Sequence, residues 1–262
     1  MTALAAAQTR DVILATTTSV RDAGLLDSLL PPFGRAAGLT VKVIAVGSGQ
    51  AMELGRRGEA DILILHDPEG EERFVADGFG VDRRALMHNE FVLVGPAQDP
   101  AGIRDRDVVT AFRRIAAAQA PFVSRGDRSG THVKELALWA QAGRMPGGRW
   151  YRESGQGMGA TLVIASELEA YTLTDVATFL AHRLPPALEI LVEGDAILRN
   201  PYHVVRANPA RFAHVNADGA AALAAYLLSP DTQRMIGEFR RVELGRSVFV
   251  PDAVTVGDGR RR

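Results

Sequence analysis

The sequence predicts an α/β fold for this chain of 262 residues. Short apolar runs of strand length alternate with segments of helical periodicity, which is typical of a sheet covered by helices. Apolar residues make up 47% and charged residues 23%, which is ordinary for a globular protein. Because the first third of the chain has a βαβαβ rhythm, we expect a mostly parallel sheet with helices on both faces.

The first third supplies four of the expected strands. Apolar runs bounded by turn residues predict strands at residues 12–15, 41–46, 61–65 and 90–94. After the first strand we expect a helix that ends near Pro31-Pro32. Its apolar face consists of Leu25, Leu26, Leu29 and Leu30. Two shorter helices are expected at residues 50–57 and 71–76.

The same alternation continues after Pro100. The apolar stripe of an amphipathic helix at residues 107–119 consists of Val108, Ala111, Phe112 and Ile115. Thr174-Asp175 is a suitable N-cap for a further helix. The remaining expected strands are residues 122–123, 188–192 and 202–205, and the remaining helices are residues 131–142, 158–167, 219–228 and 232–240.

Two stretches are candidates for crossovers between two lobes, namely Val94-Gly95-Pro96 and Glu193-Gly194-Asp195. We therefore predict a discontinuous first lobe of residues 11–94 plus 195–262, and a second lobe of residues 95–194. The length of the chain suits two small lobes of this kind.

Charge, cysteine content and the lengths of apolar runs limit the functional classes to which the chain could belong. A formal net charge of -1 gives no indication of a nucleic-acid partner or an anionic membrane surface, and the absence of cysteine excludes disulfides and thiolate metal sites. No apolar run approaches the ~18 residues that span a bilayer. The stretch Leu4–Gln8 has the A-x-A spacing of a signal cleavage site, so we expect the remnant of an export signal and a periplasmic or extracellular location. A simple Ala-rich terminus is the alternative.

Three polar turns each follow an expected strand and lead into an expected helix. They are Thr16–Ser19, Gly47–Gln50 and Ser124–His132. Ligands of open α/β sheets bind beyond the carboxyl ends of the strands, where helix N-termini present unpaired N–H groups that suit an anion. Glycine permits close backbone approach, hydroxyls donate without adding charge, and Arg125 supplies a permanent positive charge.

Each turn also has a simpler interpretation. Thr16–Ser19 is equally compatible with a helix cap, as are Ser129 and Thr131, and Arg125 could be a surface partner of Asp127. Gly47-Ser48-Gly49 is not a dinucleotide loop, because Met52 occupies the last glycine position of G-x-G-x-x-G. A fourth Gly-rich stretch, residues 155–161, is either part of a ligand site or a flexible turn with a cap.

The sequence shows no pattern of a catalytic or metal site. G-x-S-x-G, H-E-x-x-H and the phosphate-binding P-loop are all absent. We interpret His66-Asp67 and His132 as residues that start helices or support a site, in preference to metal ligands. We therefore expect a protein that is not an enzyme and that has no cofactor.

Seven segments carry a resemblance that spans Val12 to Pro251. They are TTTSVRDAGLLDSLLPPF, VIAVGSGQAMELGRRGEADILILH, MHNEFVLVGP, FVSRGDRSGTH, WYRESGQGMGATL, YTLTD and NPYHVV. On these segments the chain resembles the tungstate-specific substrate-binding proteins of bacterial and archaeal ABC transporters. The resemblance implies a type II periplasmic-binding-protein fold, with two α/β lobes joined by a two-stranded hinge and tungstate in the cleft between them.

The family's T-T-S and G-[ST]-G-Q turns supply donors from one lobe, and its S-R-G-D-x-S-G-T-H segment supplies them from the other. The oxyanion-binding residues that the resemblance implies here are Thr17, Thr18, Ser19, Ser48, Arg125, Ser129, Gly130 and Thr131. The chain departs from the family pattern at Ser48, where threonine is common, at Glu90, where aspartate is expected, and at Arg128, where an acid is more usual. Arg128 would alter the charge near the ligand unless it points to solvent.

The implied function is high-affinity binding of tungstate, by closure of the lobes around the dianion, for delivery to a membrane permease. Molybdate or another tetrahedral oxyanion is the alternative ligand, because the sequence cannot separate ions of the same charge and shape. An intracellular oxyanion sensor or store is the alternative class, and an enzyme acting on a phosphorylated or acyl substrate is the third. The expected partners are the oxyanion and the permease, without nucleic acid, and the expected state is a monomer.

Overall fold

A computed structural model describes residues 11–182 and 188–253 of the chain. The stretch Leu4–Gln8, with its signal-like spacing, lies outside the described residues. The strands are β1 (Val12–Thr17), β2 (Val41–Val46), β3 (Ile62–Leu65), β4 (Gly80–Pro96), β5 (Phe122–Ser124), β6 (Tyr151–Glu153), β7 (Thr172–Asp175), β8 (Leu188–Val192), β9 (Arg199–Ala207) and β10 (Val250–Pro251).

The helices largely follow the expected periodicity. They are α1 (Thr18–Asp22), α2 (Leu25–Ala37), α3 (Ser48–Arg56), α4 (Pro68–Ala76), α5 (Val108–Ala118), α6 (Gly130–Gln141), α7 (Met158–Glu167), α8 (Val176–Ala181), α9 (Ala217–Leu227), α10 (Pro230–Glu238) and α11 (Arg241–Leu244), with a 3₁₀ turn at Ala196–Leu198. The predicted N-cap at Thr174-Asp175 is confirmed, because the Asp175 side chain accepts a hydrogen bond from the Thr178 N–H at 2.9 Å.

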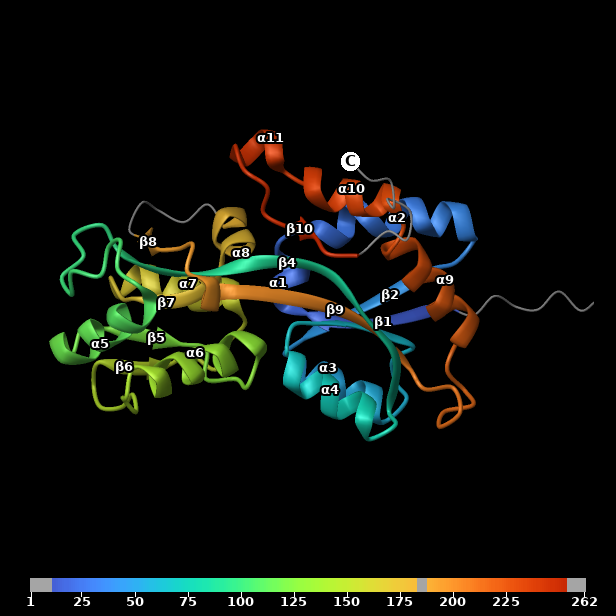
Figure 1. Cartoon of the computed structure of the whole chain (residues 1–262), viewed down its shortest axis with the longest axis horizontal. Coiled ribbons are helices and arrows are strands. Elements are labelled where there is room, and N and C mark those ends of the chain that lie inside the picture. Colours follow the sequence, from blue (N-terminus) through green and yellow to red (C-terminus); the bar gives the residue numbers. More distant parts are fainter. Residues whose placement is uncertain (1–10, 183–187, 254–262) are drawn as a thin grey trace, which may run out of the picture.

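The α/β class and the two-lobe arrangement predicted above are confirmed. The main sheet has the strand order β10-β4-β9-β3-β1-β2, while β7 and β8 pair with the distal part of β4. Figure 1 shows β4 and β9 side by side between two groups of elements, one around β1 and β2 and the other around β5, β6 and β7. The lobe boundaries at residues 94/95 and 194/195 stay a prediction.

The expectation of a mostly parallel sheet is only partly correct. β1 pairs in parallel with β2 and β3, and β5 pairs in parallel with β6. β9, however, is antiparallel to both β3 and β4, and β4 is antiparallel to β7, β8 and β10. The reason is topological: β4 carries the chain from the first lobe to the second and β9 carries it back. Hydrophobic periodicity does not reveal this direction.

The strand predicted at residues 90–94 is much longer in the structure. β4 has 17 residues, of which Gly80 to Glu90 pair with β9 and Phe91 to Pro96 pair with β7 and β8. Its first half mixes buried, partly buried and exposed positions and has two irregularities of register. The search for apolar runs missed this half of the strand because it contains charged residues. A partly exposed hinge strand needs no continuous apolar run.

The helix expected to end at Pro31-Pro32 continues to Ala37, so that boundary was wrong. Leu25, Leu29 and Phe33 bury one face of α2 in the core, while Pro31 is exposed on the other. The buried apolar contacts evidently outweigh the ~3 kcal/mol that proline costs inside a helix. Gly38, with φ of 66°, provides the left-handed residue that ends the helix.

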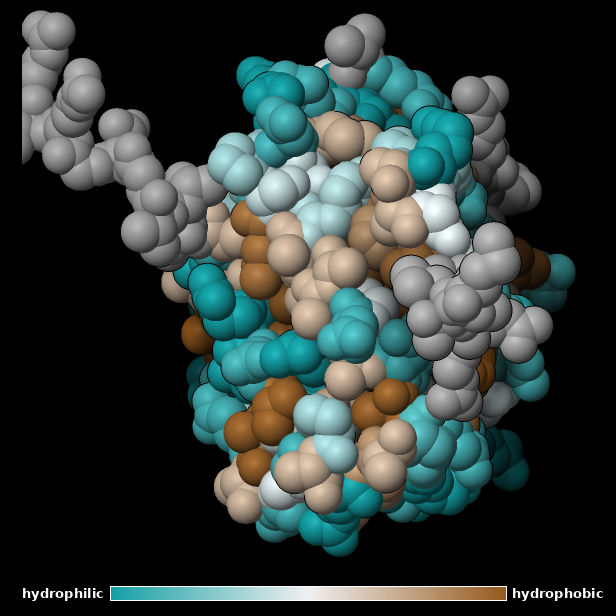
Figure 2. Space-filling view, turned by 90° about the vertical axis from the view of Figure 1, so that its right-hand side faces the viewer, coloured by the Kyte–Doolittle hydropathy of each residue, from teal (hydrophilic) through white to brown (hydrophobic). Residues whose placement is uncertain are grey.

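Figure 2 shows the end of the molecule that lies on the right in Figure 1. Its hydrophobic residues are interrupted by hydrophilic ones and form no continuous apolar face. Within residues 11–182 and 188–253, no helix combines the length and the apolar composition that crossing a membrane requires.

Glu135 gives the second lobe a titratable group in its core. The side chain of Glu135 is almost fully buried, and its carboxylate accepts hydrogen bonds from Trp139 Nε1 at 3.0 Å and the Tyr151 hydroxyl at 2.8 Å. Burial is the main cause that raises the pKa of Glu135 from 4.5 to about 7.

We predict that Glu135 makes the folded state less stable as the pH rises. Between pH 4.5 and 7 the unfolded chain loses this proton while the folded protein keeps it, so stability falls across this window and levels off above pH 7. Relative to Glu135→Gln, the wild-type free energy of unfolding should drop by about 3 kcal/mol between pH 4 and pH 8. Urea unfolding at both pH values measures this, and parallel profiles of the two proteins would contradict it.

Candidate functional site

The first two polar turns lie next to each other because their strands are neighbours. β1 and β2 pair in parallel with Thr17 opposite Val46, so both strands end at the same edge of the sheet. The chain enters α1 directly after Thr17 and enters α3 after Gly47. The N-termini of both helices therefore point their unpaired N–H groups toward this edge.

The third turn meets the first two from the other lobe. A methyl group placed on Gly47 would lie 3.7 Å from the Cα and Cβ atoms of Ser129, and one on Gly49 would lie 3.7 Å from the carbonyl oxygen of Arg128. Arg125 Nη2 lies 3.5 Å from the hydroxyl oxygen of Thr18. The structure thus brings all three predicted turns together between the lobes.

This region concentrates buried polar atoms without a partner. Among the described residues, the buried side-chain atoms that make no hydrogen bond are Thr17 Oγ1, Ser19 Oγ, Ser48 Oγ, His66 Nε2, Arg125 Nε, Thr131 Oγ1, His132 Nε2 and Asp175 Oδ2. Five of these side chains are predicted site residues. Because buried polar groups are normally paired, such a cluster indicates a place for a ligand that can accept several hydrogen bonds.

The hydroxyl groups of the first turn do not cap their helix. Thr17 is the N-cap residue of α1, yet its side chain makes no capping hydrogen bond, and Ser19 is 1% exposed with an unpaired hydroxyl. Thr16 is occupied elsewhere, since its hydroxyl donates to the carbonyl oxygen of Ile64 at 3.1 Å. The interpretation of this turn as a simple cap therefore fails.

Ser129 and Thr131 differ in whether they cap the helix that follows the third turn. Ser129 caps α6, because its Oγ accepts from the His132 N–H at 3.3 Å. Thr131 lies in the first turn of the same helix with its hydroxyl buried and unpaired. Gly130 lies between them and carries no side chain, so its backbone approaches the ring of His66 closely.

Arg125 is a buried cation rather than a surface residue. Its side chain is 2% exposed, and Nη2 contacts Asp127 Oδ2 at 2.5 Å. The pair with Asp127 expected by the simpler interpretation thus exists, but its Arg125 side chain is buried while Asp127 is partly exposed. Asp127 Oδ1 also accepts from the Ser129 N–H at 3.1 Å, so this carboxylate holds the turn together. The Nε–H of Arg125 stays free for a ligand.

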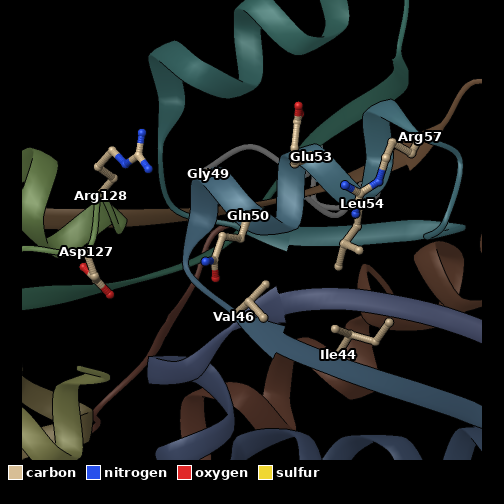
Figure 3. Close-up of a pocket in the computed structure, with 9 residues that line it drawn as sticks. All are labelled: Ile44, Val46, Gly49, Gln50, Glu53, Leu54, Arg57, Asp127 and Arg128. Atoms are coloured by element: carbon tan, nitrogen blue, oxygen red, sulfur yellow. The ribbon is translucent and has the colours of Figure 1, made fainter. Parts of the chain in front are cut away.

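Arg128 lies apart from the buried cluster. It is exposed, has a φ of 58°, and lines an open groove of about 730 Å³ together with Gln50, Glu53 and Arg57. Figure 3 shows the Arg128 side chain directed away from Asp127 and the strand ends. The solvent-facing alternative for this departure from the family pattern is the one that the structure supports.

The Gly-rich fourth turn also reaches the cluster. α7 begins after Gly157, and a methyl group there would lie 3.8 Å from the Thr18 hydroxyl oxygen. The hydroxyl of Thr161 is engaged within the turn, at 3.0 Å from the Gly157 carbonyl oxygen and 2.8 Å from Ser154 Oγ. This turn therefore lies beside the site, but Thr161 offers no free donor to it.

Three further side chains in the region were not predicted as site residues. Asp67 caps α4, which confirms the helix-start interpretation for that residue, but His66, His132 and Asp175 keep buried unpaired atoms. His66 directly follows β3, so its place at a strand end was the signal that could have identified it. Across residues 11–182 and 188–253, no group of three or more His, Cys, Asp or Glu side chains is arranged to hold a metal ion.

The chain is similar to proteins with a named ligand. A family model described as a PBP superfamily domain matches residues 2–231. The chain is 46% identical over 245 residues to the tungstate-binding protein TupA of Peptoclostridium acidaminophilum, covering 92% of this chain and 86% of that protein.

Two solved structures are similar over most of the chain. The tungstate ABC transporter structure from Geobacter sulfurreducens is 46% identical with a TM-score of 0.81, covering 87% of this chain and 98% of that one. The tungstate-binding protein TupA from Desulfovibrio alaskensis G20 is 42% identical with a TM-score of 0.78, covering 94% and 100%.

Proposed function

The chain belongs to the PBP superfamily, and from this premise we propose that it binds tungstate and delivers it to the permease of an ABC transporter. The observation that carries the proposal is the cluster of buried, unpaired donors where the three turns meet. Tungstate offers four acceptor oxygens and no protons, so it complements hydroxyls, a guanidinium and helix N-termini.

We propose that the predicted residues bind the ion in two groups. Thr17, Thr18, Ser19 and Ser48 donate from the first lobe, and Arg125, Ser129, Gly130 and Thr131 donate from the second. Hydrogen bonds to charged groups contribute roughly 1.5–3 kcal/mol each, so half a dozen outweigh the ~4–15 kcal/mol lost on association. Since donors come from both lobes, the shell is complete only when the lobes close.

The same donors would accept molybdate, which has the same charge and shape, so preference for tungstate is the narrower part of the proposal. Sulfate is smaller and would leave some donors short of contact. Phosphate carries a proton at neutral pH and needs an acceptor. Asp127, the acceptor nearest Arg125, already accepts a hydrogen bond at each carboxylate oxygen, so the proton of phosphate would need another acceptor in the site.

Thermal unfolding with tungstate, molybdate, sulfate and phosphate at equal concentration tests this function. A ligand at a hundred times its dissociation constant stabilises the folded state by ~2.7 kcal/mol. We expect a large rise of the melting temperature with tungstate, a smaller rise with molybdate and none with the other two. No rise with any of the four ions would overturn the proposal.

The wider setting is also a proposal. The relatives of this chain are binding proteins. We propose that the chain binds its oxyanion without turnover, acts as a monomer outside the cytoplasmic membrane, and needs no cofactor. Release of product from a generic phosphate ester, under conditions where tungstate inhibits it, would instead support an enzyme.

Two buried threonines with opposite hydrogen bonding provide a matched prediction. Thr131 and Thr161 both lie in the first turn of a helix, at 1% and 0% exposure, but only the Thr161 hydroxyl is paired. Thr131→Val should weaken tungstate binding roughly 10- to 100-fold, since it loses a hydrogen bond to a charged group, and should not lower the stability of the ligand-free protein.

Thr161→Val should instead lower the stability of the ligand-free protein and leave tungstate binding intact. Losing its internal hydrogen bonds should cost the ligand-free protein about 1–3 kcal/mol and leave the tungstate affinity within a few-fold of wild type. Calorimetric titration and urea unfolding of both variants measure the two effects. Equal losses of affinity in the two variants would contradict the assignment of Thr131.

A further inference from the structure

His66 has a buried nitrogen that the proposed site does not yet use. The residue follows β3 and is 5% exposed. Its ring stacks on Tyr202 at a centroid distance of 5.0 Å. A methyl group on Gly130 would lie 2.7 Å from Cε1 and 2.9 Å from both ring nitrogens of His66. The imidazole is thus packed against the N-terminus of α6, and its Nε2 has no partner among the described residues.

A chain of hydrogen bonds decides which nitrogen of His66 carries the proton. Asn200 Nδ2 donates to Asn89 Oδ1 at 2.7 Å and to the Tyr202 hydroxyl at 3.0 Å, so Asn200 Oδ1 is left to accept. His66 Nδ1 lies 2.9 Å from that oxygen and must therefore be the donor. A neutral ring then leaves Nε2 as a bare acceptor beside Gly130 at the N-terminus of α6.

The network of hydrogen bonds continues across the two hinge strands. Asn89 lies opposite Asn200 in the pairing of β4 with β9, and its Nδ2 donates to Asp175 Oδ1 at 3.0 Å. His66 from the first lobe and Asp175 at the end of β7 are therefore linked through both hinge strands. The second carboxylate oxygen of Asp175 is buried and unpaired. The network therefore ends at two titratable side chains with an unpaired atom each, His66 Nε2 and Asp175 Oδ2.

The charges around the site leave a dianion poorly compensated. Arg125 is its buried cation, and Asp127 already balances that charge at 2.5 Å. Burial lowers the pKa of His66 and Arg125 acts in the same direction, while Asp175 and Glu71 raise it. Tyr202 is the remaining titratable group stacked on the ring, and burial raises its pKa. The unliganded imidazole is thus held neutral, and a dianion beside it would reverse that balance.

We propose that His66 is a ligand-contacting residue of this site, and that its Nε2 takes up a proton from solvent when the dianion enters. This inference rests on the proposed function, because it needs an oxyanion between the three turns. The proton turns the one bare ring acceptor into a charged donor and gives the site a second cation. Tungstate binding is then coupled to protonation of the protein.

The coupling has a definite sign. A group that gains a proton on binding has a higher pKa in the complex than in the free protein, so the affinity falls as the pH rises between the two values. Over that window the dissociation constant should increase about tenfold for each pH unit. Without a titrating His66, affinity should stay nearly constant over the same range.

Isothermal titration calorimetry of the full chain with sodium tungstate tests the proposal. Measurements at pH 7.5 in two buffers with different ionisation enthalpies give the number of protons taken up per ion. We expect about one for the wild type and nearly none for His66→Asn, whose amide can still donate to Asn200. Its tungstate affinity should be lower but measurable and nearly independent of pH from 7 to 8.

Asp175→Asn is the matched control for the other end of the network, and it should keep the proton uptake. His66→Gln provides a second non-titrating variant if His66→Asn does not fold. Uptake near zero in the wild type, unchanged uptake in both His66 variants, or loss of uptake only in Asp175→Asn would each overturn the role of His66. Absence of any tungstate binding by the wild type would overturn the proposed function instead.

Discussion

Arg125→Ala should lower the affinity for tungstate by about 10²–10⁴-fold while the protein stays folded. Arg125 is 2% exposed and is the cation that both the sequence and the structure place among the three turns. Truncating one partner of a buried, hydrogen-bonded charge pair in a binding site typically costs about 2–5 kcal/mol of binding free energy, and every ~1.4 kcal/mol is a factor of ten in affinity. Calorimetric titration with tungstate measures the loss.

Arg128→Ala is the matched control, because Arg128 belongs to the same turn but is exposed in the open groove. It should change the affinity by less than about threefold at physiological salt, since exposed charges are screened. Arg125→Lys should recover only part of the loss, because an ammonium group cannot reproduce the planar fork of a guanidinium. Tight binding by folded Arg125→Ala would remove this residue from the site.

Trp139→Ala should destabilise the protein by about 3–5 kcal/mol, since it removes the largest side chain of the second lobe's core. Trp139 is fully buried, with ring centroids 4.4 Å from Phe112 and 5.2 Å from Phe122. The change also removes the indole N–H that donates to Glu135 at 3.0 Å, so the carboxyl group keeps fewer partners. Urea unfolding followed by far-UV circular dichroism measures the effect.

Trp150→Ala provides the comparison for Trp139. Its ring packs 5.6 Å from that of Trp139 but is only half-buried, so its loss should cost distinctly less. Both variants should reach wild-type far-UV spectra without denaturant. Equal destabilisation by the two changes would mean that Trp139 does not anchor this core.

Much of the fold was readable from local patterns. The helix at residues 158–167 and the strands at residues 41–46 and 188–192 have the predicted bounds, because each is a compact apolar segment closed by turn residues. β4 escaped detection over its first ten residues, since the exposed positions of a hinge strand carry charges. The helix end at Pro31 was misjudged because burial of Leu25, Leu29 and Phe33 overrides a local signal.

The sequence by itself determined which segments could bind an anion, because strand ends followed by glycine, hydroxyl residues and arginine are local features. Only the tertiary structure decided which of these groups are free. Ser129 Oγ accepts a hydrogen bond in a helix cap and keeps only its own O–H to donate, while Thr131, two residues later, keeps a fully unpaired hydroxyl. Arg125 is buried rather than exposed beside Asp127.

His66 shows the same division most clearly. Its position after a strand is visible in the sequence, but its tautomer depends on Asn200 and Asn89, which are far away along the chain. Burial and hydrogen bonding depend on partners that the fold brings from both lobes, so a local pattern cannot specify them. The chemistry of the turns is thus encoded locally, while the availability of each donor and proton is set by packing between the lobes.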